Sequence, residues 1–247
     1  MANATALAIA SDHRLIILLR DIERTSRDAE GVEFEDYTRG VELLIASTNP
    51  GKIREIRAVL DGLALKLYTL ADLGKLKEPA ETGRTFADNA LLKARYYAQA
   101  SHLLTVAEDS GLVIDALNGR PGVQSARYPG ATYPEKFDRL YRELAPHPRP
   151  WTARFVCSLA FVGTSKSMLP PDVPLFRCEA TVEGEIAPEP AGSNGFGYDP
   201  IFYYPPYETT LGNVDDERKL RVAHRGKAFR EFRQWLMLGR DRSVAPS

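Results

Sequence analysis

The sequence predicts an α/β fold, and two features of the residue pattern carry this prediction. From Val41 onwards, apolar runs rich in β-branched residues alternate with stretches whose apolar residues recur at helical spacing. Two longer runs, residues 152–162 and 176–186, have strand composition and are joined by a loop that contains proline and serine. Such a pair favours a long antiparallel hairpin, so we expect helices packed on a mixed sheet.

Length and charge exclude some classes of protein. The 247 residues suffice for one large domain or two lobes, with roughly 70–75% of the unfolded surface buried. Lys and Arg total 32 against 33 for Asp and Glu, a formal charge of −1, so no overall basic field is available to hold nucleic acid. We therefore expect no nucleic-acid partner. Any polyanionic ligand must be bound by a local group of residues.

Cysteine usage and hydropathy predict the compartment. Cys157 and Cys178 show neither CxxC nor histidine spacing, so we expect two reduced thiols without a zinc site or a disulfide. The longest apolar runs are far shorter than the ~20 residues of a membrane helix, and the start lacks the basic-then-apolar order of a signal peptide. We expect a cytoplasmic protein with no membrane partner.

Residues 1–40 are a predicted N-terminal extension. An apolar run at 15–19 is flanked by charges and followed by an acidic stretch typical of a linker. We favour a short amphipathic helix that packs on the main domain, because its apolar run would otherwise be exposed to water. A segment that binds a partner and an ill-ordered leader are the alternatives. The main domain is predicted at 41–240, and residues 241–247 form a C-terminal tail.

The first strand and helix of the main domain meet at a turn with the features of a phosphate site. Residues 41–48 read as a strand, Asn49 can cap a helix, Pro50 suits its first position, and the helix runs to Leu60. The free N–H groups of a helix start attract anions, and Lys52 is unfavourable there unless an anion binds. An ordinary turn with a solvated lysine is the alternative.

A strand at residues 65–70 and a second helix to about Ala100 follow. The segment 85–88 resembles a capping box, which opens this helix. Lys93 falls on the edge of its apolar stripe, where a lysine either extends along the surface to solvent or reaches into a site. In the loop before this helix, Glu81 offers an oxygen ligand of the kind that Mg²⁺ takes, although a lone glutamate is more often a solvated surface acid.

The apolar run at 103–107 ends in two adjacent acids, Glu108 and Asp109. We interpret this place as a strand that breaks into a turn, with the next strand at 112–117. Adjacent carboxylates repel one another and resist burial, so a bound divalent metal or a raised pKa that serves proton transfer would account for them. Ser110 is either a plain turn former or a donor to a phosphate oxygen.

The C-terminal part adds helices at 134–144 and from about 222 to 238, with a glycine-rich loop at 192–199 between them. The loop glycines allow the backbone to approach a planar ligand, although a tight loop between strands is the alternative. Lys219 can bind a phosphate group, although a single lysine is more often a solvent-exposed surface charge. The loop and the last helix together offer ring faces, acceptors and donors to a base, from Phe196, Gly197, Tyr198, Asp199, His224 and Arg225.

These segments resemble the motifs of one family, the inosine triphosphate pyrophosphatases, which hydrolyse deaminated purine nucleoside triphosphates to the monophosphate and pyrophosphate. The match spans about residues 41–240, in order and at family spacing. The motifs that carry it are STNPGKIRE at 47–55, ETGRTF from 81, AEDSGL from 107, FGYDPIF from 196, and HRG from 224.

The resemblance implies an elongated mixed sheet with two lobes and a central cleft, usually in a homodimer. It implies that Asp109 activates water with Glu108 in support, and that Glu81 and Asp109 hold Mg²⁺. The purine nucleoside triphosphate would contact Ser47, Thr48, Asn49, Pro50, Gly51, Lys52, Lys93, Ser110, Phe196, Gly197, Tyr198, Asp199, Lys219, His224 and Arg225.

Two departures from the family pattern stand near the last motif. Ala223 replaces the usual serine, and residues 212–214 replace a segment that contains glutamate. One lost hydroxyl hydrogen bond is worth only ~0.5–1.5 kcal/mol, so we expect the reaction to survive and the selectivity to shift. Two other functions remain open: a related pyrophosphatase for pyrimidine or modified nucleotides, and a non-catalytic nucleotide-binding protein.

Overall fold

The computed structural model describes residues 40–74, 76–163 and 174–238. The predicted extension and tail, including the expected helix at 15–19, therefore lie outside the described residues. Among the described helices, none combines the length and the apolar character that crossing a membrane requires.

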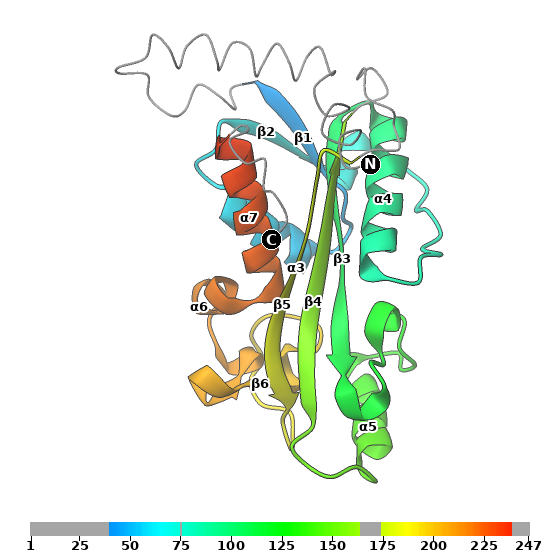
Figure 1. The fold of residues 1–247 in the computed structure, drawn as a ribbon, viewed down its shortest axis with the longest axis vertical. Coiled ribbons are helices and arrows are strands. Elements are labelled where there is room, and N and C mark those ends of the chain that lie inside the picture. Colours follow the sequence, from blue (N-terminus) through cyan, green and yellow to red (C-terminus); the bar gives the residue numbers. More distant parts are fainter. Residues whose placement is uncertain (1–39, 75, 164–173, 239–247) are drawn as a thin grey trace, which may run out of the picture.

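The fold is a seven-stranded mixed sheet with helices on both faces, which confirms the predicted α/β class (Figure 1). The strand order is β2-β1-β3-β4-β5-β6-β7; the first three strands run parallel and the later neighbours antiparallel. The strands are β1 Val41–Ile45, β2 Leu65–Thr69, β3 Leu104–Ile114, β4 Thr152–Val162, β5 Phe176–Ile186, β6 Phe202–Tyr204 and β7 Thr209–Thr210.

Five α-helices are present in the described part of the chain. Two of them begin as the sequence predicts: the side chain of Asn49 accepts a hydrogen bond from Lys52 N at 3.1 Å, and Thr85 with Asp88 forms a capping box. These contacts satisfy backbone N–H groups that a helix start otherwise leaves free. The helices are α3 Pro50–Leu60, α4 Phe86–Ser101, α5 Tyr133–Leu144, α6 Asp216–Val222 and α7 His224–Leu238.

Alternation along the strands assigns the helices to opposite faces of the sheet. Leu43 and Ile45 of β1 pack in one core cluster with α3 and α7, whereas Leu44 between them packs in another with α4. This follows from the period of two along a strand. Figure 1 shows α3 and α7 on one side of the long strands and α4 on the other.

β4 and β5 occupy the predicted ranges and pair antiparallel from Thr152–Glu185 to Phe161–Phe176. The residues that join them, 164–173, lie outside the described part. Together with β3, these strands run along most of the length of the molecule, with β1, β2 and α4 toward one end and α5 and β6 toward the other (Figure 1).

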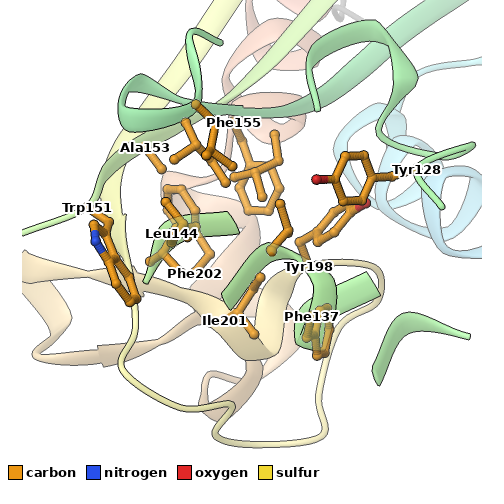
Figure 2. Close-up of a cluster of buried hydrophobic side chains, with 14 of the residues drawn as sticks. Tyr128, Phe137, Leu144, Trp151, Ala153, Phe155, Tyr198, Ile201 and Phe202 are labelled. Atoms are coloured by element: carbon orange, nitrogen blue, oxygen red, sulfur yellow. The ribbon is translucent and has the colours of Figure 1, made fainter. Parts of the chain in front are cut away.

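The end of the molecule near α5 has its own buried cluster. Figure 2 shows side chains from β4, α5 and the segment 198–202 converging there. Phe155 and Phe202 lie 4.4 Å apart between ring centroids, and the Tyr198 hydroxyl donates to the Ser125 carbonyl at 2.7 Å. These contacts fix the glycine-rich loop and the loop before α5 relative to the sheet.

The expected break in the third strand is wrong. β3 continues through Glu108, Asp109 and Ser110, which pair with β4 residues, and it ends at Ile114. Residues 115–117, expected in a second strand, form a short 3₁₀ turn. The strand continues because cations from α3, α4 and α7 neutralise its carboxylates, so the buried acids need no turn at this point.

Candidate active site

A cavity of about 80 Å³ lies at the middle of β3, between α3, the glycine-rich loop and the start of α7. Ser125 and Ala126, from the loop before α5, complete its wall together with Tyr133 and Phe155. The cavity brings together residues that are up to 176 positions apart in the chain. The predicted site residues in its lining are Asn49, Lys52, Ser110, Phe196, Gly197, Tyr198, Asp199, Lys219, His224 and Arg225.

A larger hollow, of about 380 Å³, lies beside the same loop and shares Tyr133, Phe196 and Gly197 with the cavity. The one charged residue among the described residues that line it is Asp138. Without a lysine or arginine, this hollow lacks the groups that would hold a phosphate chain. The smaller cavity is therefore the candidate site for an anionic ligand.

Several other predicted residues support the cavity from outside its lining. The Ser47 hydroxyl accepts a hydrogen bond from Asn49 N at 3.2 Å and so shapes the turn that contains Thr48. Pro50 is the first residue of α3. Gly51 leaves room for the ring of Phe196, because a Cβ at position 51 would lie 2.6 Å from that ring.

Glu108 is buried on the face of the sheet that α3 and α7 cover. Its Oε1 lies 2.6 Å from Lys52 Nζ and 3.6 Å from Arg225 Nε, and Cys157 Sγ donates to Oε2 at 3.5 Å. Burial would raise the pKa of Glu108, but Lys52, Arg225 and Lys93 outweigh it and hold this pKa well below its usual range. Glu108 is thus a permanent anion that fixes two cations beside the cavity.

Asp109 points to the opposite face, toward α4, as expected for the next residue of a strand. Its Oδ1 lies 2.9 Å from Lys93 Nζ, and Asn89 Nδ2 donates to Oδ2 at 3.3 Å. Burial raises the pKa of Asp109; Lys93 opposes this rise, and the negative charge of Glu108 reinforces it. Of the two neighbouring acids, Asp109 is therefore the better proton acceptor.

Glu81 lies close to Asp109 because both bind the same lysine. Lys93 Nζ is 2.7 Å from Glu81 Oε1, and Arg127 binds the other carboxylate oxygen. Burial would raise the pKa of Glu81, but Lys93 and Arg127 together lower it. Lys93 thus points toward β3 and joins the two acids that sequence analysis paired, although it is not among the residues that line the cavity.

A second buried ion-pair cluster includes Glu55, which sequence analysis did not single out. Lys219 Nζ lies 2.7 Å from Glu55 Oε1 and 2.6 Å from Asp199 Oδ2, and Arg225 Nη1 lies 2.5 Å from Glu55 Oε2. Arg225 Nη2 also donates to Ser110 Oγ at 2.8 Å. This cluster ties α3, the glycine-rich loop, α6, α7 and β3 together at the cavity.

A signal for Glu55 was present in the sequence. Gly51, Glu55 and Val59 recur at a spacing of four residues and lie on the buried side of α3. A carboxylate within such a buried stripe requires a cation or several donors, because an unpaired buried charge is strongly unfavourable. The helix pattern therefore marks Glu55 as paired, but it does not indicate the partner.

Two aromatic contacts complete the cavity. Lys219 Nζ lies 4.6 Å from the ring centroid of Phe196, in cation–π geometry. His224 stacks on Phe155 with ring centroids 4.9 Å apart, and its Nδ1 is buried without a hydrogen-bond partner. Burial holds the pKa of His224 well below its usual value, so its imidazole is neutral near pH 7.

Five cations around the site are already paired with carboxylates. The pairs are Lys52 with Glu108, Lys93 with Glu81 and Asp109, Arg127 with Glu81, Lys219 with Glu55 and Asp199, and Arg225 with Glu55 and Glu108. An anionic ligand must therefore exchange ion pairs on binding, or arrive with a cation that occupies the carboxylates.

Comparison with known proteins gives the family. Residues 43–235 match the Ham1 family. A dITP/XTP pyrophosphatase from Thermus thermophilus is 45% identical over 197 residues, covering 78% of this chain and 90% of the relative, and one from Halalkalibacterium halodurans is 38% identical over 200 residues, covering 79% and 98%.

Solved structures agree with the sequence comparison. A HAM1 protein from Coxiella burnetii superposes with a TM-score of 0.73 at 37% identity, covering 80% of this chain and 99% of that protein. The Ham1 protein of Staphylococcus aureus gives 0.70 at 34% identity, covering 81% and all of that chain. Fold and sequence similarity cover about the same share of the chain, which confirms the family that the motifs predicted: this chain belongs to the Ham1 family.

Proposed function

We propose that the chain hydrolyses deaminated purine nucleoside triphosphates, namely ITP, dITP and XTP, to the monophosphate and pyrophosphate. The observation that carries the proposal is that Lys93 of α4 joins Glu81, in the loop before that helix, to Asp109 of β3, the strand that borders a cavity lined by Asn49 and Lys52. Carboxylates beside a cation-lined cavity are the groups that phosphoryl transfer needs. The names of the Thermus and Halalkalibacterium relatives support the same substrates.

The donor set fits Mg²⁺ as the cofactor. Mg²⁺ takes oxygen ligands, commonly one or two carboxylates together with waters and substrate phosphates. Glu81 and Asp109 supply two such carboxylates, and a shared lysine holds them together in the structure. A bound Mg²⁺ would supply Lewis-acid stabilisation of the charge on the transferring phosphoryl group. Bound Mg²⁺ would then compete with Lys93 for the charge of these two carboxylates.

Side chains of the protein supply the other catalytic functions. Asp109, with its raised pKa, orients or deprotonates the attacking water, and Glu108 keeps Lys52 at the cavity wall. Lys52 and Lys93 neutralise charge on the triphosphate, with the N-terminus of α3 and Asn49 beside them. The water attacks phosphorus and pyrophosphate departs.

The base binds at Phe196 in this proposal, beside the start of α3. Phe196 offers a ring face, and Lys219 and Arg225 are the donors nearest to it. A donor aimed at the six-position oxygen of hypoxanthine or xanthine rejects adenine, because its amino group would leave two donors facing each other. Stacking and donor placement together would select the deaminated purines.

We further propose that the enzyme works as a homodimer in the cytoplasm, which the resemblance to the inosine triphosphate pyrophosphatases supports. Light scattering coupled to size-exclusion chromatography of the full chain tests the dimer, for which twice the 27.5 kDa chain mass is expected.

Release of pyrophosphate from a panel of nucleotides tests the proposed function. We expect kcat/KM for ITP and XTP to exceed that for ATP by roughly 10² or more, since an unpaired donor penalises the six-position amino group of adenine. Removal of Mg²⁺ with a chelator is expected to abolish turnover. The panel includes pyrimidine and modified triphosphates: faster hydrolysis of one of these would favour the related-pyrophosphatase alternative, and nucleotide binding without hydrolysis would favour a non-catalytic binding protein.

The substitution Gly51→Ala tests the place of the base. A Cβ at position 51 would lie 2.6 Å from Cδ1 of Phe196, so the ring must move out of its present position. Overpacking of this kind is unfavourable by ~1–3 kcal/mol, and we expect the KM for ITP to rise roughly tenfold while α3 stays folded. An unchanged KM would show that the ring position does not contribute to binding.

A further inference from the structure

Arg127 holds one oxygen of Glu81, and although it stands in a segment that resembles the family's metal and catalytic block, the resemblance gives it no role. It lies in the loop between β3 and α5, and its guanidinium binds Glu81 Oε2 while Lys93 Nζ lies 2.7 Å from Oε1. Both oxygens of the proposed metal ligand are therefore occupied by cations. A metal that binds Glu81 must therefore compete with these two cations for the carboxylate charge.

The backbone next to Arg127 is fixed at the wall of the cavity. The Ser125 hydroxyl accepts from Leu112 N at 2.9 Å, and the Ser125 carbonyl accepts from the Tyr198 hydroxyl. Lys136 Nζ donates to the Ala126 carbonyl at 2.6 Å. Because the two preceding residues are held and line the cavity, the Arg127 side chain stays within reach of the rim whatever its partner is.

Exposure indicates which cation leaves Glu81. The side chain of Lys93 is 13% exposed and has a second carboxylate, Asp109, 2.9 Å away. The side chain of Arg127 is 50% exposed, and its ion pair is with Glu81. Water solvates the half-exposed guanidinium of Arg127 far better than the mostly buried ammonium of Lys93, so the Arg127 contact is the easier one to break.

We propose that Arg127 is a positioning residue that exchanges partners during binding: it holds Glu81 in the free protein and transfers to the triphosphate when Glu81 turns to the metal. This inference rests on the proposed function. A planar guanidinium with several donors matches phosphate oxygens well, and the incoming nucleotide brings them to this rim. The exchange keeps the charge balanced, because Arg127 gains an anion as Glu81 gains a cation.

The exchange makes two predictions of opposite sign for Arg127→Gln. In nucleotide-free protein, Mn²⁺ titrated calorimetrically should bind about three- to tenfold more tightly, because Glu81 loses its competing cation. Inorganic pyrophosphate titrated in the presence of Mg²⁺ should bind about 10- to 100-fold more weakly, as a charge-assisted hydrogen bond is lost. A residue that only supports the loop would not tighten metal binding.

Arg120→Gln is the matched control. Arg120 stands in the same loop, and its Nη1 lies 2.8 Å from Glu143 of α5 with a side chain that is 58% exposed. The substitution removes the same charge and a comparable ion pair, so both affinities should stay within about twofold of wild type. Equal effects of the two substitutions would overturn the proposal, since they would reflect net charge alone.

Glu81→Gln separates failure of this inference from failure of the proposed metal site. If the substitution leaves Mn²⁺ affinity unchanged, Glu81 is not a ligand, and both proposals fall. If it weakens Mn²⁺ binding at least tenfold while Arg127→Gln leaves it unaltered, the metal site stands and the exchange is rejected. Weaker binding in Glu81→Gln with tighter binding in Arg127→Gln supports both.

Discussion

Replacing Asp109 by asparagine should lower kcat for ITP hydrolysis by roughly 10²–10⁴, the range for removal of a general base. The amide keeps the size of the side chain and can still accept from Asn89, but it carries no charge for a metal and takes up no proton. Burial raises the pKa of Asp109, which suits a residue that takes a proton from water. Pyrophosphate release at saturating ITP and Mg²⁺ measures the effect.

Asp115→Asn is the control for this substitution. Asp115 immediately follows β3, its Oδ1 lies 3.0 Å from Arg154 Nη1, and its side chain is 51% exposed. The change removes the same charge at the end of the same strand, far from the cations of the site, and kcat should stay within about twofold. Near-wild-type kcat in Asp109→Asn, with circular dichroism showing an intact fold, would reject the role of Asp109.

Replacing Glu55 by alanine should have the largest effect on stability, lowering the free energy of unfolding by about 3–5 kcal/mol. Glu55 is 5% exposed, and its partners Lys219 and Arg225 are each 2% exposed. Removal of the carboxylate leaves two buried cations with one neutralising group fewer, and water cannot reach them easily. Urea denaturation followed by tryptophan fluorescence gives the unfolding free energy.

The exposed pair of Glu42 and Lys66 provides the control. Lys66 Nζ lies 2.9 Å from Glu42 Oε1, close to the 2.7 Å of the buried pair, but the side chains are 63% and 45% exposed. Glu42→Ala should leave the urea midpoint unchanged within error, because solvent replaces the lost contact. Similar decreases in unfolding free energy for Glu42→Ala and Glu55→Ala would show that burial does not determine how much an ion pair stabilises the protein.

Local signals in the sequence predicted much of the fold. The cap of α3 and the capping box of α4 each involve residues three positions apart, and the ranges of β4 and β5 follow from runs of eleven residues. Such features depend on neighbours along the chain, so the residue pattern suffices to find them. The motifs likewise identified the family, because their order and spacing are properties of the sequence.

The electrostatics of Glu108 and Asp109 could not be predicted from their neighbours. Two adjacent acids indicated a turn, whereas β3 continues through them and sends them to opposite faces. The cations that make this possible come from α3, α4 and α7, and a local pattern does not show which helix will cover which face. The prediction failed because the compensating charges are remote in sequence.

By itself, the sequence determined the α/β class, the starts of α3 and α4, the family and most of the residues that line the cavity. Only the tertiary structure decided that Glu55 pairs with Lys219 and Arg225, 164 and 170 positions away, that Lys93 joins Glu81 to Asp109, and that Arg127 competes for Glu81. The reason is physical: backbone propensities act over a few residues, whereas buried charges are neutralised by whichever opposite charges the packing of helices on the sheet brings within about 4 Å.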